Sequence, residues 1–276
     1  MSRPDAAERE GVAEVAGGPA SSTGLSKPAW SAYADHFLLD KSVVFMNHGS
    51  FGATPRQVLI AQERVRQRME AEPIRFFVEE LEVLLDDSRS EMSKFVGCDP
   101  EGFAFVFNAT AGVNAVVRSL DLSPGDELLT STHEYNACNN VLRWAVEKTG
   151  AVMVNADVPF PIRDEDEAVD AILAKVTSRT KLALVSHITS PTALIMPVER
   201  IVRELQRRDV DTLVDGAHAP GFLPLDVSRI NAAYYTGNFH KWVCAPKGAA
   251  ILHVRRDRQA GLHPSVISHG YTSLRR

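Results

Sequence analysis

Residues 181–218, with the sequence KLALVSHITSPTALIMPVERIVRELQRRDVDTLVDGAH, contain two apolar runs separated by an amphipathic segment. The apolar runs at 182–185 and 210–214 predict strands, and the segment 198–207 predicts a helix. Two strands joined by a helical crossover pair in parallel, because the crossover returns the chain to the edge of the sheet where it started. This stretch therefore predicts one unit of a parallel sheet.

The same alternation extends in both directions along the chain. Further strands are predicted at 103–107, 127–130, 152–154, 232–236 and 248–253, and further helices at 56–72, 76–95, 113–120, 139–148 and 164–175. The last two strands are close enough in sequence to form a hairpin, which would make one strand antiparallel. The pattern predicts an α/β fold with a mainly parallel sheet and helices on both faces.

Composition excludes several classes of protein. Hydrophobic residues make up 45% and charged residues 24% of the 276 residues, which are ordinary values for a globular chain. No apolar run approaches the roughly 20 residues that a membrane-spanning helix needs, so we expect no membrane partner. The net charge is −5, so there is no basic surplus of the kind that binds nucleic acid.

The cysteines and the first residues bear on the cellular environment. Cys98, Cys138 and Cys244 form no CxxC pair, so the sequence predicts neither a disulfide framework nor a metal site. Residues 1–27 combine acidic residues with Gly, Ala and Ser and lack the apolar core of a signal peptide. We therefore expect a disordered tail at 1–27, a folded domain at 28–276 and a cytoplasmic location.

Polar clusters follow several predicted strands, where open α/β sheets bind their ligands. Small residues at 108–114 open a helix, whose free N–H groups and dipole suit a phosphate, although an ordinary capped helix start looks the same. Asp215 ends a strand, where its carboxylate can hold a proton on a heterocyclic nitrogen or cap the next segment. Each cluster alone leaves both alternatives open.

Lys241 and Tyr135 belong to two further clusters. Lys241 lies between His240 and Trp242, and partial desolvation would lower its pKa and leave a nucleophilic amine suited to a Schiff base. The alternative is a lysine whose stem passes its aromatic neighbours to reach water. Tyr135 could lie on a flat cofactor or pack on a neighbouring helix. Together, the anion site, the aromatic ring, the carboxylate and the lysine suit pyridoxal phosphate.

The order and composition of these segments resemble the class V aminotransferase family of pyridoxal-phosphate enzymes, and most of all its isopenicillin N epimerase-like subgroup. The matching strings are FMNHGSFG at 45–52, NATAGVN at 108–114, HEYNA at 133–137, SHITSPT at 186–192, VDGAH at 214–218, GNFHKW at 237–242 and APKGAA at 245–250. Seven ordered motifs make a plain α/β binding protein without the cofactor the weakest of the alternatives.

The resemblance implies a role for each matching residue. Lys241 would form the Schiff base with the cofactor, and Asp215 would keep the pyridine nitrogen protonated. The remaining expected contacts are His187 and His218 to the ring hydroxyl, Ala109, Thr110, Asn238 and His240 to the phosphate, Tyr135 or His133 stacked on the ring, and Asn47, His48 and Gly49 toward the substrate. The resemblance also implies the large domain of fold type I, with about seven strands, and a homodimer.

The implied reaction takes place at the α-carbon of an amino acid, by epimerisation or by carbon–sulfur lysis, with sulfur transfer less supported. Two departures from the subgroup stand out. Ala111 occupies a position that is often Glu, and the chain ends before the small C-terminal domain that would carry the arginine for the substrate carboxylate. Arg275 and Arg276 are a poor substitute. The alternative function is therefore a scaffold that binds the cofactor or dimerises without turnover of its own.

Overall fold

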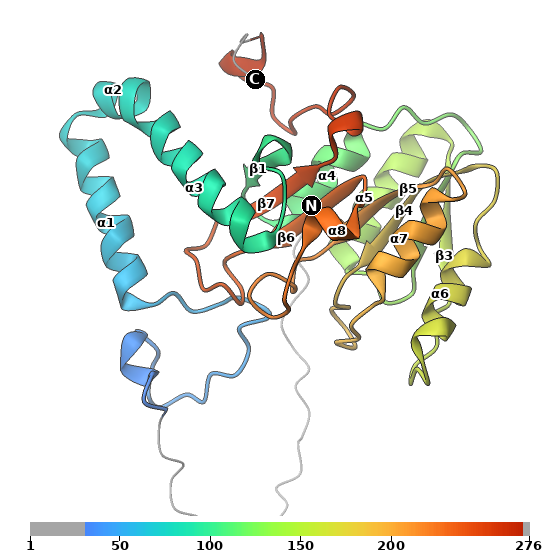
Figure 1. The fold of residues 1–276 in the computed structure, drawn as a ribbon, viewed down its shortest axis with the longest axis horizontal. Helices are drawn as coiled ribbons and strands as arrows, with labels where there is room; N and C mark the ends of the chain where they lie inside the picture. Colours follow the sequence, from blue (N-terminus) through green and yellow to red (C-terminus); the bar gives the residue numbers. More distant parts are fainter. Residues whose placement is uncertain (1–30, 273–276) are drawn as a thin grey trace, which may run out of the picture. The chain divides into compact units, whose positions relative to one another are not determined.

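The computed structural model describes residues 31–272 (Figure 1), so the tail predicted at 1–27 lies outside the described residues. Contacts group the chain from Asp35 onward into one compact unit. Within the described part of the chain, no helix is both long and apolar enough to cross a membrane.

A single sheet of seven strands forms the centre of this unit. The strands are β1 (Phe103–Val106), β2 (Glu127–Ser131), β3 (Val152–Ala156), β4 (Thr180–Ser186), β5 (Asp211–Asp215), β6 (Tyr234–Asn238) and β7 (Ala250–Val254). Their order is β1-β7-β6-β5-β4-β2-β3, and β7 runs antiparallel to both of its neighbours while the other pairs are parallel. The predicted mainly parallel sheet with one antiparallel strand is confirmed.

Helices cover both faces of the sheet (Figure 1). They are α1 (Arg56–Ala71), α2 (Pro73–Arg75), α3 (Leu81–Val96), α4 (Ala109–Arg118), α5 (Asn136–Thr149), α6 (Glu165–Leu173), α7 (Val198–Gln206) and α8 (Val227–Ile230), with a π-helical segment at Phe76–Glu80 and 3-10 turns at Ala34–His36, Pro100–Gly102, Arg256–Arg258 and His269–Thr272. Alternate residues of each strand point to opposite faces. Leu128 and Leu213 pack with α4 and α5, whereas Leu129 and Val214 pack with α6, α7 and α8.

Several boundaries differ from the sequence prediction. The helix predicted from residue 113 begins at Ala109, so the small residues form its first turn and Asn108 is its N-cap. The strand predicted at 232–236 is β6, which begins and ends two residues later. Its last residues, Gly237 and Asn238, pair with Ile251 and Ala250 of β7, so tertiary pairing extends the strand past its apolar run.

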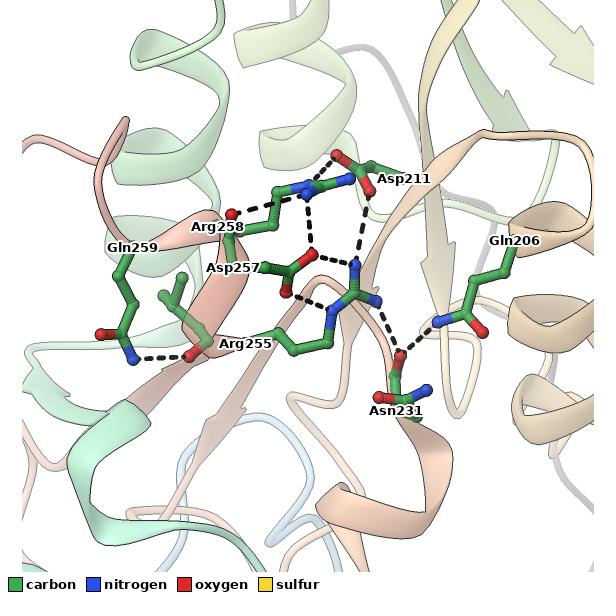
Figure 2. A network of polar contacts seen from close by, with 8 residues as sticks. Gln206, Asp211, Asn231, Arg255, Asp257, Arg258 and Gln259 are labelled. Atoms are coloured by element: carbon green, nitrogen blue, oxygen red, sulfur yellow. Dashed lines mark hydrogen bonds and ion pairs between the residues drawn. The ribbon is translucent and has the colours of Figure 1, made fainter.

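Charged residues gather at the amino end of β5 (Figure 2). Asp211 binds Arg258 at 2.6 Å, and Asp257 binds Arg255 at 2.6 Å and Arg258 at 2.7 Å. Arg255 also donates to the carbonyl oxygen of Asn231 at 3.2 Å. This network joins the segment after β7 to the start of β5, at the end of the strand away from Asp215.

Candidate active site

A cavity of about 450 Å³ opens at the carboxyl ends of the central strands. The last residues of β4, β5 and β6, which are Ser186, Asp215 and Asn238, all line it. The other lining residues are Asn47, Gly49, Ser50, Phe51, Asn108, Ala109, Thr110, Tyr135, Ile188, Ser190, Ala217, His218, His240 and Lys241. Ligands of open α/β sheets bind at this edge, so the cavity is the candidate active site.

The amino end of α4 forms one wall of the cavity. The Asn108 side chain accepts a hydrogen bond from the Ala111 N–H at 2.8 Å, and Asn238 accepts one from the Ala109 N–H at 2.8 Å. A Cβ on Gly112 would lie 2.4 Å from Thr236 Oγ1, so glycine lets α4 lie directly on β6. The first turn of a ten-residue helix therefore points its positive dipole end into the cavity, which favours an anionic group there.

Asp215 supplies a carboxylate on the cavity floor. Its Oδ1 accepts from the Ala217 N–H at 2.9 Å and its Oδ2 from the Cys138 thiol at 3.2 Å. Burial raises the pKa of Asp215, while the charge of Lys241 acts in the opposite direction. A positive group placed against Asp215 would therefore stabilise its ionised form.

Lys241 projects into the same space and pairs with His218. The distance from Lys241 Nζ to His218 Nε2 is 3.0 Å. Burial lowers the pKa of His218 to about 4, assisted by the charge of Lys241, so the imidazole is neutral and its Nε2 can accept a hydrogen bond from the amine. Burial also lowers the pKa of Lys241. The amine is consequently closer to its reactive neutral form than an exposed lysine.

A loop at residues 47–54 packs directly against the turn that carries Lys241. The Gly52 N–H donates to the carbonyl oxygen of His240 at 3.0 Å, Thr54 donates to that of Ala245 at 3.2 Å, and Lys247 donates to that of Gly52. A Cβ on Gly52 would lie 2.3 Å from the carbonyl oxygens of both His240 and Lys241. The loop therefore needs glycine to reach the backbone of Lys241.

We expect Gly52→Ala to lower stability by at least about 2 kcal/mol, because the new methyl group meets backbone that cannot rotate away. The thermal midpoint would fall by about 4–8 °C. The matched control is Gly261→Ala, whose Cβ would meet nothing within 4 Å. Thermal unfolding of both variants checks this. Equal midpoints would show that the loop yields without cost.

Three of the histidines expected at the site do not line the cavity. His187 is buried with its Nδ1 3.1 Å from Tyr235 Oη, and burial lowers its pKa to about 4. His133 is held between the Val158 carbonyl oxygen at 2.8 Å and Thr192 Oγ1 at 3.0 Å. His48 accepts from the Ala53 N–H at 3.3 Å and stacks on Trp242. The other residues expected at the site all line the cavity.

Sequence reasoning missed the serines of this wall. Ser186, Ile188 and Ser190 line the cavity, although only the histidine of that motif was expected there. No local signal identified them, because β4 ends at Ser186 and the alternation of a strand does not extend to Ile188 and Ser190.

The cavity fits pyridoxal phosphate by the chemistry of its donors. An amine, a buried carboxylate, a helix amino end and the half-exposed ring of Tyr135 converge there from four separate segments. These are the groups that an aldehyde, a pyridine nitrogen, a phosphate and a flat ring require. A volume of about 450 Å³ also lies in the range for cofactor pockets.

Comparison with known proteins agrees with this chemistry. The profile of the family described as aminotransferase class V matches residues 48–273. An isopenicillin N epimerase of Amycolatopsis lactamdurans is 38% identical over 250 residues, which cover 88% of this chain and 62% of that protein. A probable chloroplastic L-cysteine desulfhydrase of Arabidopsis thaliana is 30% identical over 250 residues, covering 84% of this chain and 53% of that protein.

The chain thus spans less than two thirds of the length of these relatives. Among solved structures, a C-DES variant with glycine covalently linked to its pyridoxal-phosphate cofactor superposes with a TM-score of 0.76 at 24% identity, covering 81% of this chain and 60% of that one. The cystine C–S lyase C-DES in complex with cysteine persulfide gives the same TM-score at 25% identity, also covering 81% of this chain and 60% of that one.

These findings confirm the predicted fold type I architecture and indicate pyridoxal phosphate as the cofactor. The family match covers more than half of the sequence and includes every residue predicted for the site except Asn47. The chain belongs to the aminotransferase class V family.

Proposed function

We propose that this chain binds pyridoxal phosphate through Lys241 and acts at the α-carbon of an amino acid, as an epimerase or a carbon–sulfur lyase. The observation that carries the proposal is the placement of Lys241, whose Nζ lies 3.0 Å from the neutral His218, in the same cavity as Asp215. Partners would be a small amino-acid substrate and a second copy of the chain.

When bound, the cofactor withdraws electrons from the α-carbon of an attached amino acid. Once its amine is released from the cofactor, Lys241 would be the group placed to accept the proton that leaves this carbon and to return it. Its pKa is lowered by burial, and a base with a pKa nearer neutrality transfers protons more effectively. His218 Nε2 accepts a hydrogen bond from the amine, which orients it.

The other cavity residues would hold the cofactor and leave the amine free to act. Asp215 would pair with the ring nitrogen, and the first turn of α4 with Asn238 and His240 would bind the phosphate. His240 donates through Nδ1 to the Ala249 carbonyl oxygen at 3.2 Å, and this bond leaves its Nε2 available for the phosphate. Tyr135, whose side chain is half exposed, would cover one face of the ring.

Epimerisation and carbon–sulfur lysis both remain candidate reactions, because the relatives are named after both activities. The isopenicillin N epimerases at 37–38% identity favour return of the proton to either face of the carbon. The L-cysteine desulfhydrases at about 30% identity favour loss of a sulfur group from the β-carbon.

Phe51 and Phe107 are large exposed apolar side chains at or next to the cavity, which supports coverage of this edge by a second copy.

Exchange of the α-proton in deuterated water tests the proposal. The protein with added pyridoxal phosphate is incubated with single amino acids, and mass spectrometry and chiral chromatography follow the products. We expect deuterium at the α-carbon. An epimerase would yield both stereoisomers without fragmentation, whereas a lyase would release sulfide from cysteine, or cysteine persulfide from cystine, together with pyruvate and ammonia. Binding of the cofactor without any exchange would leave the chain a scaffold without turnover.

A further inference from the structure

Glu134, Cys138 and Asp215 form a buried cluster beneath the cavity. Glu134 follows β2, Cys138 lies in the first turn of α5 and Asp215 ends β5. One side-chain oxygen or sulfur atom of each lies within 4.8 Å of the others, and all three residues are buried. Cys138 donates to Asp215, and its thiol pKa is strongly raised by burial and by both carboxyl groups. The thiol of Cys138 therefore stays protonated and neutral beside the two carboxyl groups. A metal ion would need the thiolate, so the cluster is not a metal site.

The two oxygens of Glu134 have different surroundings. Oε1 accepts hydrogen bonds from the Tyr135 N–H and from Ser186 Oγ, both at 2.8 Å. Oε2 is buried and has no hydrogen-bond partner among the described residues. Leaving this oxygen unpaired costs less free energy in a neutral carboxylic acid than in a carboxylate, where Oε2 would carry an unpaired partial charge.

We propose that Glu134 is a positioning residue for Asp215: it stays a neutral acid whose hydroxyl faces Cys138, and Cys138 in turn donates its thiol proton to Asp215. This inference rests on the proposed function, in which Asp215 faces the ring nitrogen of the cofactor. Glu134 also holds Ser186, another residue of the cavity wall, through Oε1. One buried acid thus connects two walls of the site.

The electrostatics of the surrounding elements agree with this assignment. Burial and then the charge of Asp215 raise the pKa of Glu134 to about 8. Lys241, after β6, is the cation facing Asp215, and Tyr235 of β6 and Cys138 of α5 are neutral groups on the same carboxylate. Because this cation lies on the side of Asp215, the negative charge of the pair belongs on Asp215 and the proton belongs on Glu134.

The pH dependence of stability in the cofactor-free protein is the first test. Because the folded-state pKa of Glu134, about 8, lies above the ordinary value of 4.5, the folded protein holds a proton that the unfolded chain releases. Stability is then lost as pH rises toward 8, with the unfolding constant increasing by up to about tenfold per pH unit from this group. We expect Glu134→Gln to remove this contribution and to flatten the profile.

The control is Glu147→Gln, which makes the same charge change at an exposed position of α5. It should keep the wild-type slope. A Glu134→Gln profile parallel to that of the wild type would overturn the inference. This measurement needs no cofactor, so it can succeed or fail independently of the proposed function, which fails if the wild-type protein does not attach pyridoxal phosphate.

Infrared spectroscopy of the cofactor-loaded wild type gives a second test, which can be carried out even if the Glu134→Gln variant does not fold. The two buried carboxyl groups of the cluster, Glu134 and Asp215, both have a raised pKa. We expect the C=O stretching band of a protonated acid at neutral pH, its loss at higher pH, and its absence in loaded Glu134→Gln. A loaded wild type without the band, or a band that persists in Glu134→Gln, would overturn the inference.

Discussion

Replacing Lys241 with Ala should abolish the covalent attachment of pyridoxal phosphate. The wild-type protein, reduced with borohydride in the presence of the cofactor, should carry it on the peptide that contains Lys241, and the variant should carry none there. The physical reason is the partial burial of this amine, which lowers its pKa and leaves it a nucleophile inside the cavity. Absorbance in the visible range and peptide mass spectrometry measure the outcome.

Lys181→Ala is the control for this loss of one amine. Lys181 is an exposed residue of β4 whose Nζ lies 3.8 Å from Asp126, far along the strand from the cavity wall at Ser186. This variant should be labelled like the wild type. Labelling of Lys241→Ala to the same extent as the control would show that another amine holds the cofactor, and the proposed role of Lys241 would be wrong.

Asp215→Asn should weaken cofactor binding by about 10–150-fold, the equivalent of the 1.5–3 kcal/mol that a hydrogen bond to a charged group contributes. Asn keeps the size of the side chain and one oxygen that can accept from the Ala217 N–H, but its NH2 group cannot accept from the Cys138 thiol, so the negative charge and one acceptor are lost. Without the negative charge, a protonated ring nitrogen would have no counter-charge in a buried site. Titration of the cofactor-free protein with pyridoxal phosphate measures the change.

The other end of the same strand supplies the control for Asp215. Asp211→Asn removes an identical charge from β5, but there the carboxylate belongs to the arginine network at the amino end of the strand (Figure 2). Its effect should be on stability and not on affinity for the cofactor. If both variants bound pyridoxal phosphate equally well, Asp215 would not be the partner of the ring nitrogen.

Most of the fold could be predicted from the sequence because its signals are local. Apolar runs and amphipathic segments alternate along the chain, and each strand needs only a few consecutive residues to be recognised. The predictions were weakest at the ends of elements. Asn108 caps α4 five residues before the predicted start, and β6 extends to Asn238 because β7 supplies its partners. Capping and pairing depend on neighbours in space, which a local pattern does not contain.

The sequence by itself determined the layers of this protein and the chemical groups of its candidate site: Lys241, Asp215, Tyr135 and the small residues that open α4. Only the tertiary structure decided which side chains face the cavity. It turned His187 toward Tyr235 and Ser186 toward the cavity, and it brought Glu134 to Cys138 and Asp215 from three separate elements. The physical reason is that orientation and burial arise from packing between distant segments, whereas residue type and periodicity are properties of the chain.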